Sequence, residues 1–362
     1  MTLKAFQKKA AACAAAAVLS FSMLPAPTAN AGWGSIIGGA IQVAGQYQQA
    51  DEAMKYYDND GREEFFQKMK AQYGVNNDPE LNARLDDIMY GLTDAVGAVD
   101  PSIYDKPYNY FINQDNSFNA FCSLGHNMSV NTGMFNLVAN DDEIAVVLAH
   151  EMGHGQKEHV RKGLKGRLNA VLAGTVIAGA TGVDALGNIL VNNINAVHVT
   201  KPKEWEADNL AFDYITHSAY NPGACAAIWQ RVMEQYGSKS SDFVGDIFSP
   251  SDHPSHKERR DNYIKKLKEY SGGKVSVKFA DNAALIQVNG KDFMTPAPDD
   301  VMSGSERACF IAGNLAAAYH NGSAGEAYND GETLYFGSQP VLSVYPGDPS
   351  LDELTAALNN IR

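Results

Sequence analysis

The sequence is poor in cysteine. Its 362 residues include four cysteines, and one of them, Cys13, lies in an N-terminal segment that we expect to be removed. The other three, Cys122, Cys225 and Cys309, are far apart and can form at most one bridge, which excludes a disulfide framework. We favour buried free thiols at all three positions over one bridge and a leftover thiol.

Apolar runs long enough to cross a membrane are also lacking, because a spanning helix needs about 20 residues. Leu168–Val183 has no charge but is short and contains glycine, so we expect a buried or surface-associated helix pair there. Ala10–Leu24 is apolar, follows a lysine-containing start and precedes Ala29-Asn30-Ala31, the small-x-small pattern of a cleavage site. Residues 1–31 are therefore predicted to be a signal peptide rather than a membrane anchor. Cleavage after Ala31 would leave the mature chain in the periplasm or outside the cell.

Basic residues are outnumbered by acidic ones. Removing residues 1–31 takes away three lysines and no acids, which leaves 26 basic against 42 acidic residues and a formal charge near −16. A surface this acidic disfavours nucleic acids and anionic membranes as partners. With 45% hydrophobic residues and no internal repeat, the chain can bury a core as one large domain or two ordinary ones.

The chain up to about residue 270 has mainly helical patterns. Gly32–Gly45 is glycine-rich and expected to be irregular or loosely helical, whereas short strands are expected at Tyr108–Gln114 and Asn127–Asn131. A further helix starts at the acidic residues 141–143, where the helix dipole favours negative charge. Apolar periodicity and capping residues predict the other helices at Gln46–Tyr73, Pro79–Val96, Lys203–Tyr220, Ala224–Tyr236 and His256–Tyr270.

The pattern changes at Ser271-Gly272-Gly273. Beyond it apolar residues alternate with period two, and Asn289-Gly290 is placed for a tight hairpin turn. The sequence thus predicts an α+β chain with a mostly helical domain at residues 32–271 and a small α+β C-terminal domain at residues 272–362. This second domain has no chemical motif, so we expect it to pack against the main domain or to present protein partners to it.

Residues 150–154 have the sequence HExxH. On an α-helix two residues four apart differ by about 40° in direction, so His150 and His154 can share one zinc ion. Glu151 would then lie beside the metal, where it is suited to act as the general base.

His159 is expected to point away from such a metal. On a continuous helix it would be rotated by about 140° from His154 and by about 180° from His150. The longer zinc-peptidase signature HExxHxxGxxH is excluded, because Lys157 and Val160 stand where that signature needs glycine and histidine. We therefore predict a solvated surface histidine at position 159.

A catalytic zinc ion usually has three protein ligands, so HExxH must be completed from elsewhere in the chain. The segment KEWEADNLAFDY offers Glu204, Glu206 and Asp208. Glu204 and Asp208 share a helix face, whereas Glu206 is rotated by about 200° from Glu204. This spacing suits one carboxylate on the metal and one behind a ligand histidine, although acids on a solvated helix face have the same pattern.

Together these elements resemble peptidase family M48, the HtpX-like and CAAX-prenyl-protease-like zinc metallopeptidases. The resemblance covers about Asp78–Tyr270 and is greatest to the soluble periplasmic branch, which includes the β-barrel assembly-enhancing proteases. The tetratricopeptide tail of those proteases has no counterpart here. Four elements in the same order support the resemblance: Asn119–Phe135 (NAFCSLGHNMSVNTGMF), HExxH, Glu204–Asp208 (ExxAD), and His253-Pro254-Ser255 with Arg259 (HPxxxxR).

The resemblance implies one zinc ion per chain, held by His150, His154 and Glu204, with Glu151 as the general base and Asp208 behind a ligand histidine. It also implies a zincin-like (gluzincin) fold. Such a fold is predominantly helical and has a small sheet, whose edge strand would bind a polypeptide substrate in extended form.

The resemblance also implies roles for two further residues. His253 would cap the zinc and keep the enzyme silent, and Arg259 would orient the active-site loop or stabilise developing charge. A loop histidine and a helix-surface arginine are the alternatives at these positions. Cys122 and His126 stand where the family commonly has small residues and glycine, so substrate access or redox sensitivity is expected to differ.

The sequence therefore predicts an exported zinc endopeptidase that cleaves unfolded or misassembled envelope proteins. The alternative is a non-proteolytic or gated protein, chaperone-like or a scaffold, that keeps zinc for structural reasons.

Overall fold

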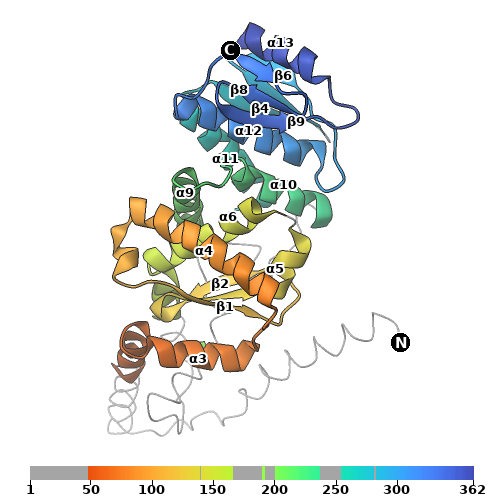
Figure 1. The fold of residues 1–362 in the computed structure, drawn as a ribbon. Coiled ribbons are helices and arrows are strands. Elements are labelled where there is room, and N and C mark those ends of the chain that lie inside the picture. The colour runs from red at the N-terminus through yellow and green to blue at the C-terminus, as the bar shows by residue number, and fades with distance from the viewer. Residues whose placement is uncertain (1–47, 139, 166–189, 192–199, 237–253, 281–282) are drawn as a thin grey trace, which may run out of the picture. The chain divides into compact units, whose positions relative to one another are not determined.

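The computed structural model describes residues 48–138, 140–165, 190–191, 200–236, 254–280 and 283–362 (Figure 1). Predictions for residues 1–31, Gly32–Gly45, Leu168–Val183 and His253 lie outside this part of the chain. Residues 49–362 form one compact unit, in which the described strands make three small sheets and most other residues are helical. The predicted mixture of many helices and small sheets is confirmed. In the same described residues, every helix is too short or too polar to cross a membrane.

The helix predicted at Gln46–Tyr73 is interrupted. Residues 48–58 are helical, Asn59-Asp60-Gly61 forms a turn, and α3 (Arg62–Tyr73) follows. These three residue types favour turns over helix interiors, which the apolar periodicity alone did not register. The turn also needs glycine, because a Cβ atom on Gly61 would lie within 2.3 Å of the Tyr56 ring.

Helix α4 (Pro79–Val99) begins where the sequence predicted. The Asp78 side chain accepts hydrogen bonds from two backbone N–H groups of the first turn, and proline occupies the first helical position. A short 3-10 helix, η1 (Pro101–Tyr104), follows directly.

A three-stranded sheet lies between α4 and the HExxH helix in the chain. It consists of β1 (Asn109–Asn113), β2 (Ala120–Ser123) and β3 (Asn127–Asn131) in the order β1-β3-β2. β1 is parallel to β3 and β2 is antiparallel to it, so β2 forms an edge of the sheet. The sequence predicted β1 and β3 but not β2, whose four residues are all buried and show no alternation. The short helices η2 (Leu124–His126) and α5 (Thr132–Leu137) flank β3.

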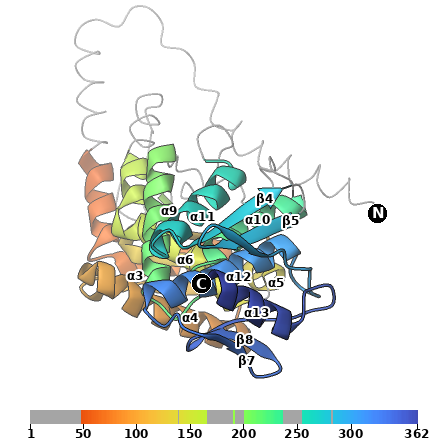
Figure 2. The ribbon, with the colours of Figure 1, turned by 90° about the horizontal axis from the view of Figure 1, so that it is seen from above.

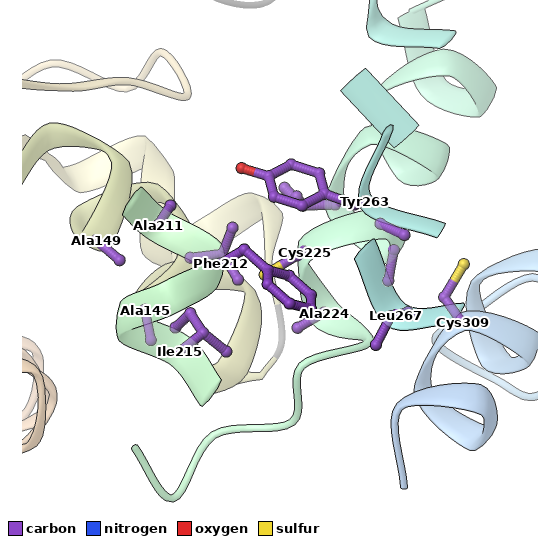
Figure 3. Close-up of a cluster of buried hydrophobic side chains, with 14 of the residues drawn as sticks. Ala145, Ala149, Ala211, Phe212, Ile215, Ala224, Cys225, Tyr263, Leu267 and Cys309 are labelled. Carbon is purple, nitrogen blue, oxygen red and sulfur yellow. The ribbon is translucent and has the colours of Figure 1, made fainter. Parts of the chain in front are cut away.

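Four helices meet in the core shown in Figure 3. Ala145 and Ala149 of α6 (Asp141–Gln156) lie beside Ala211 and Ile215 of α9 (Lys201–Thr216). The small side chains allow the axes of these two helices to approach closely. Phe212 and Tyr263 fill the space toward the other two helices. The helices are α6 (Asp141–Gln156), α9 (Lys201–Thr216), α10 (Ala224–Tyr236) and α11 (His256–Tyr270).

The residues after α11 form two further antiparallel sheets and two helices. Asn289 and Gly290 both have positive φ, 51° and 77°, which confirms the tight turn predicted between the second and third strands. The elements are β4 (Val275–Ala280), β5 (Ala283–Val288), β6 (Lys291–Met294), α12 (Gly304–His320), β7 (Ala327–Asn329), β8 (Thr333–Phe336), β9 (Gln339–Ser343) and α13 (Leu351–Ile361). Figure 2 shows the two helices near the C-terminus, and they pack against different strands: α12 against β4, β5 and β9, and α13 against β6, β7 and β8.

One hydrophobic core continues across the turn at Ser271–Gly273, since residues from α4 to α13 belong to the same buried cluster. A buried ion-pair group also crosses it: Arg231 of α10 lies 3.2 Å from Glu143 of α6 and 3.3 Å from Glu306 of α12. Burial raises the pKa of Glu306 to about 7. The division into domains at residues 271/272 stays a prediction. The shared core and the ion pairs of Arg231 connect the C-terminal residues to helices α6 and α10.

In the part of the chain that the structure describes, Cys122, Cys225 and Cys309 are buried and free, as the sequence favoured. Burial raises the pKa of all three thiols, so they stay protonated at neutral pH.

Candidate metal centre

The two HExxH histidines lie on one buried face of α6. The Asn140 side chain caps this helix by accepting a hydrogen bond from the backbone N–H of Glu143. His150 Nε2 and His154 Nε2 lie 3.0 Å apart, and both side chains are buried. The four-residue spacing thus brings two imidazole nitrogens to one point.

Glu204 reaches the same point from α9. Gly153 of α6 packs against Ala207 of α9, and a Cβ atom on Gly153 would lie 3.3 Å from Ala207 Cα, so glycine allows the helices to approach. The Glu204 carboxylate lies 3.5 Å from His150 Nε2 and 3.3 Å from His154 Nε2. One ligand atom from each residue lies within 4.8 Å of the others. Two imidazoles and a carboxylate are a donor set that suits a catalytic zinc ion with one position left open.

A buried charge network lies behind His150. Asp208 Oδ1 is 3.0 Å from His150 Nδ1, and the carboxylate also forms a two-pronged pair with Arg259, with Nε 2.8 Å from Oδ2. Tyr263 donates its hydroxyl hydrogen to Asp208 Oδ1 at 3.1 Å. Burial opposes the ionisation of Asp208, but Arg259 and the hydrogen bond from His150 outweigh it and lower the pKa of Asp208.

The sequence left open whether Arg259 is a helix-surface arginine, and this alternative is wrong because the residue is buried. Its side chain is 4% exposed, and its guanidinium lies over the Trp229 ring, 3.6 Å from the centroid. Nη2 of Arg259 also lies 3.1 Å from His150 Nδ1. The helix α11 that carries Arg259 starts with a capping box at Ser255 and Glu258, which fixes its first turn beside the site.

Glu151 lies beside the same point, buried and held by the edge strand. Its Oε2 accepts a hydrogen bond from the backbone N–H of Cys122 at 3.1 Å. Burial raises the pKa of Glu151, which strengthens it as a base. A cavity of about 30 Å³ borders Glu151, and its apolar lining includes Ala120, Val147, Ile228 and Trp229.

The prediction for His159 was wrong. The side chain is 2% exposed, with Nδ1 2.9 Å from His154 Nδ1 and Nε2 3.1 Å from Glu206 Oε2. The prediction assumed a continuous helix, but α6 ends at Gln156, and Glu158 has a left-handed backbone with φ 53°. This turn brings the ring back toward His154. No sequence signal marked the turn, because glycine or asparagine is the usual residue at positive φ and here it is a glutamate.

The two departures from the family pattern are also buried. His126 has φ 54°, donates a hydrogen bond from Nδ1 to the carbonyl oxygen of Lys106, and stacks on the Tyr108 ring. Cys122 lies in β2 with its thiol against Gly155, where a Cβ atom would come within 3.0 Å of the sulfur. Neither side chain offers a reactive surface group.

Comparisons with known proteins agree with this geometry. The model of peptidase family M48 matches residues 79–271. The chain is 29% identical over 175 residues to the metalloprotease LoiP of Escherichia coli (strain K12), an alignment that covers 46% of this chain and 66% of that protein. It is 28% identical over 149 residues to the mitochondrial metalloendopeptidase OMA1 of Saccharomyces cerevisiae, covering 41% of this chain and 43% of that protein.

The β-barrel assembly-enhancing protease of Escherichia coli (strain K12) is 20% identical over 224 residues, which cover 58% of this chain and 42% of that protein. The chain thus spans less than two thirds of the length of each of these three relatives.

Proposed function

The chain belongs to peptidase family M48, whose model matches more than half of it, and on that premise we propose that it is a zinc-dependent endopeptidase. His150, His154 and Glu204 would hold one zinc ion per chain, and Glu151 would be the general base. The observation that carries the proposal is the meeting of two imidazole nitrogens and one carboxylate at a single buried point, within 4.8 Å of one another.

When bound, zinc supplies a Lewis acid that polarises the scissile carbonyl group and makes a neighbouring water molecule more acidic. Glu151 takes the proton from the attacking water and returns it to the leaving amine nitrogen. The hydrogen bond from Cys122 N–H fixes one carboxylate oxygen of Glu151, which leaves the other oxygen to handle the proton. Asp208 and Arg259 hold the His150 ring in place.

Strand β2 is the edge along which we expect an extended polypeptide substrate to pair in a zincin-like arrangement. The apolar lining of the cavity beside Glu151 would contact an apolar side chain of that polypeptide. Backbone pairing selects extended chains, so unfolded or misassembled envelope proteins are the proposed substrates. Export follows from the signal peptide proposed at residues 1–31, and the C-terminal residues 272–362 would bind protein partners.

The test is expression of the full chain in a Gram-negative host, followed by measurement of bound zinc and of casein cleavage. We expect one zinc per chain, a mass that fits cleavage after Ala31, and loss of nearly all activity in Glu151→Gln, since the general base contributes about 10²–10⁴-fold. Glu269→Gln, which changes an exposed glutamate of α11, is the matched control and should be as active as wild type. Zinc binding without Glu151-dependent cleavage would contradict the proposal, unless His253→Ala then switches cleavage on.

A further inference from the structure

Three hydrogen-bonded side chains, His154, His159 and Glu206, lead from the metal centre to the surface. They lie behind His154, whereas Asp208 lies behind His150. We propose that His159 is a positioning residue, which fixes the proton of His154 on Nδ1, and that Glu206 in turn fixes the proton of His159. The proposal rests on the zinc site proposed above, because it concerns the atom with which His154 would bind the metal.

The proposed zinc ion, taken together with the distances, sets the direction of both hydrogen bonds. His154 Nε2 faces Glu204 and His150, so this nitrogen must offer its lone pair to a metal. A neutral imidazole has one N–H, which then sits on Nδ1. His154 Nδ1 is 2.9 Å from His159 Nδ1, so His154 donates and His159 accepts.

The proton of His159 follows from the same rule. Since His159 Nδ1 accepts, its single N–H lies on Nε2, 3.1 Å from Glu206 Oε2. The carboxylate is a strong acceptor and holds that tautomer. The two bonds therefore run the same way, from His154 through His159 to Glu206, and each one requires the other.

The backbone keeps the middle group of this chain in place. Glu158 has φ 53°, and a new helical segment begins at His159, with the N–H of Lys162 bonded to Glu158 O at 3.0 Å. The His159 ring is buried and lies 5.1 Å from the His154 ring between centroids, at 66° between planes. Such a ring has little freedom, so it can orient its neighbour rather than follow it.

A purely structural role for His159 would also explain its burial, and three substitutions distinguish the two roles. His159→Leu fills the space but accepts no hydrogen bond. His159→Asn places an amide oxygen close to the position of Nδ1 and so retains the acceptor for His154. His217→Leu removes an exposed histidine at the end of α9 and is the matched control.

The experiment is zinc competition with a chelator on the full chain, together with the melting temperature of each zinc-free protein. We expect zinc affinity to fall by roughly 10- to 100-fold in His159→Leu, by less than about 10-fold in His159→Asn, and not at all in His217→Leu. Imidazole nitrogen NMR of the zinc-loaded wild type should place the protons on His154 Nδ1 and His159 Nε2.

Zinc affinity in His159→Leu equal to that of wild type would overturn the proposal, and so would a proton on His159 Nδ1 in the NMR spectrum. If His159→Leu fails to fold, the NMR result and His159→Asn decide. Failure of the zinc site itself has a different signature, because wild type and the His217→Leu control would then bind no zinc either.

Discussion

The two histidines of the HExxH helix are supported in contrasting ways. Behind His150 lie Asp208, Arg259 and Tyr263, all of them buried and linked by an ion pair and hydrogen bonds. Behind His154 stands His159, a buried imidazole, and then Glu206, whose side chain is 50% exposed. One side of the centre is a buried network of ion pairs and hydrogen bonds, whereas the other is a series of hydrogen bonds that ends at an exposed carboxylate.

This contrast predicts which substitutions near the centre reduce the stability of the folded protein. A buried ion pair contributes little net stability, but removing one partner leaves an uncompensated charge in a medium that solvates it poorly. An exposed carboxylate is solvated whether or not it has a partner, so its loss costs little. Changes on the His150 side should therefore affect folding, and changes at the outer end of the His154 side should affect little besides the local orientation.

Asp208→Asn should produce the largest effect. The substitution keeps the shape of the side chain but removes the buried negative charge that pairs with the Arg259 guanidinium, at a cost of about 3–5 kcal/mol in the free energy of unfolding. Urea unfolding of the metal-free protein measures it, with Asp213→Asn, an exposed aspartate of the same helix, as control. A loss as small as that of the control would mean that these residues do not form the buried network of ion pairs and hydrogen bonds described above.

Tyr263→Phe should have an intermediate effect and sharpen the contrast on the buried side. It removes one hydrogen bond to Asp208 Oδ1 while Arg259 and His150 still satisfy the carboxylate. The expected loss in the free energy of unfolding is about 1.5–3 kcal/mol, the usual value for a hydrogen bond to a charged group. The same urea titration tests it, and an effect as large as that of Asp208→Asn would show that the hydroxyl matters more than the ion pair.

Much of the buried side could be predicted from the sequence, because it depends on regular helices. The four-residue spacings of His150 and His154 and of Glu204 and Asp208 hold as long as α6 and α9 are unbroken, and they are unbroken there. Helices α10 and α11 and strand β3 start and end where the sequence predicted, since capping residues, turns and periodicity agree at these places.

What the sequence did not predict depends on departures from regularity or on tertiary contacts. The position of His159 needs the left-handed Glu158, a conformation that sequence pattern cannot assign to a glutamate. The burial of Arg259 results from Trp229 and Asp208, which lie on two other helices and have no fixed spacing from it. Strand β2 was missed because all four residues are buried, so no alternation marks it.

Glu206→Gln should have the smallest effect, although Glu206 completes the series of hydrogen bonds. Glutamine keeps an oxygen that can accept the hydrogen bond from His159 Nε2, and the lost charge is half exposed, so we expect less than about 0.5 kcal/mol in the free energy of unfolding. Zinc affinity should fall by less than in His159→Leu, and raising the salt concentration should reduce the difference from wild type further. A loss comparable to that of Asp208→Asn would erase the contrast, because it would place the critical charge of the centre at its exposed end.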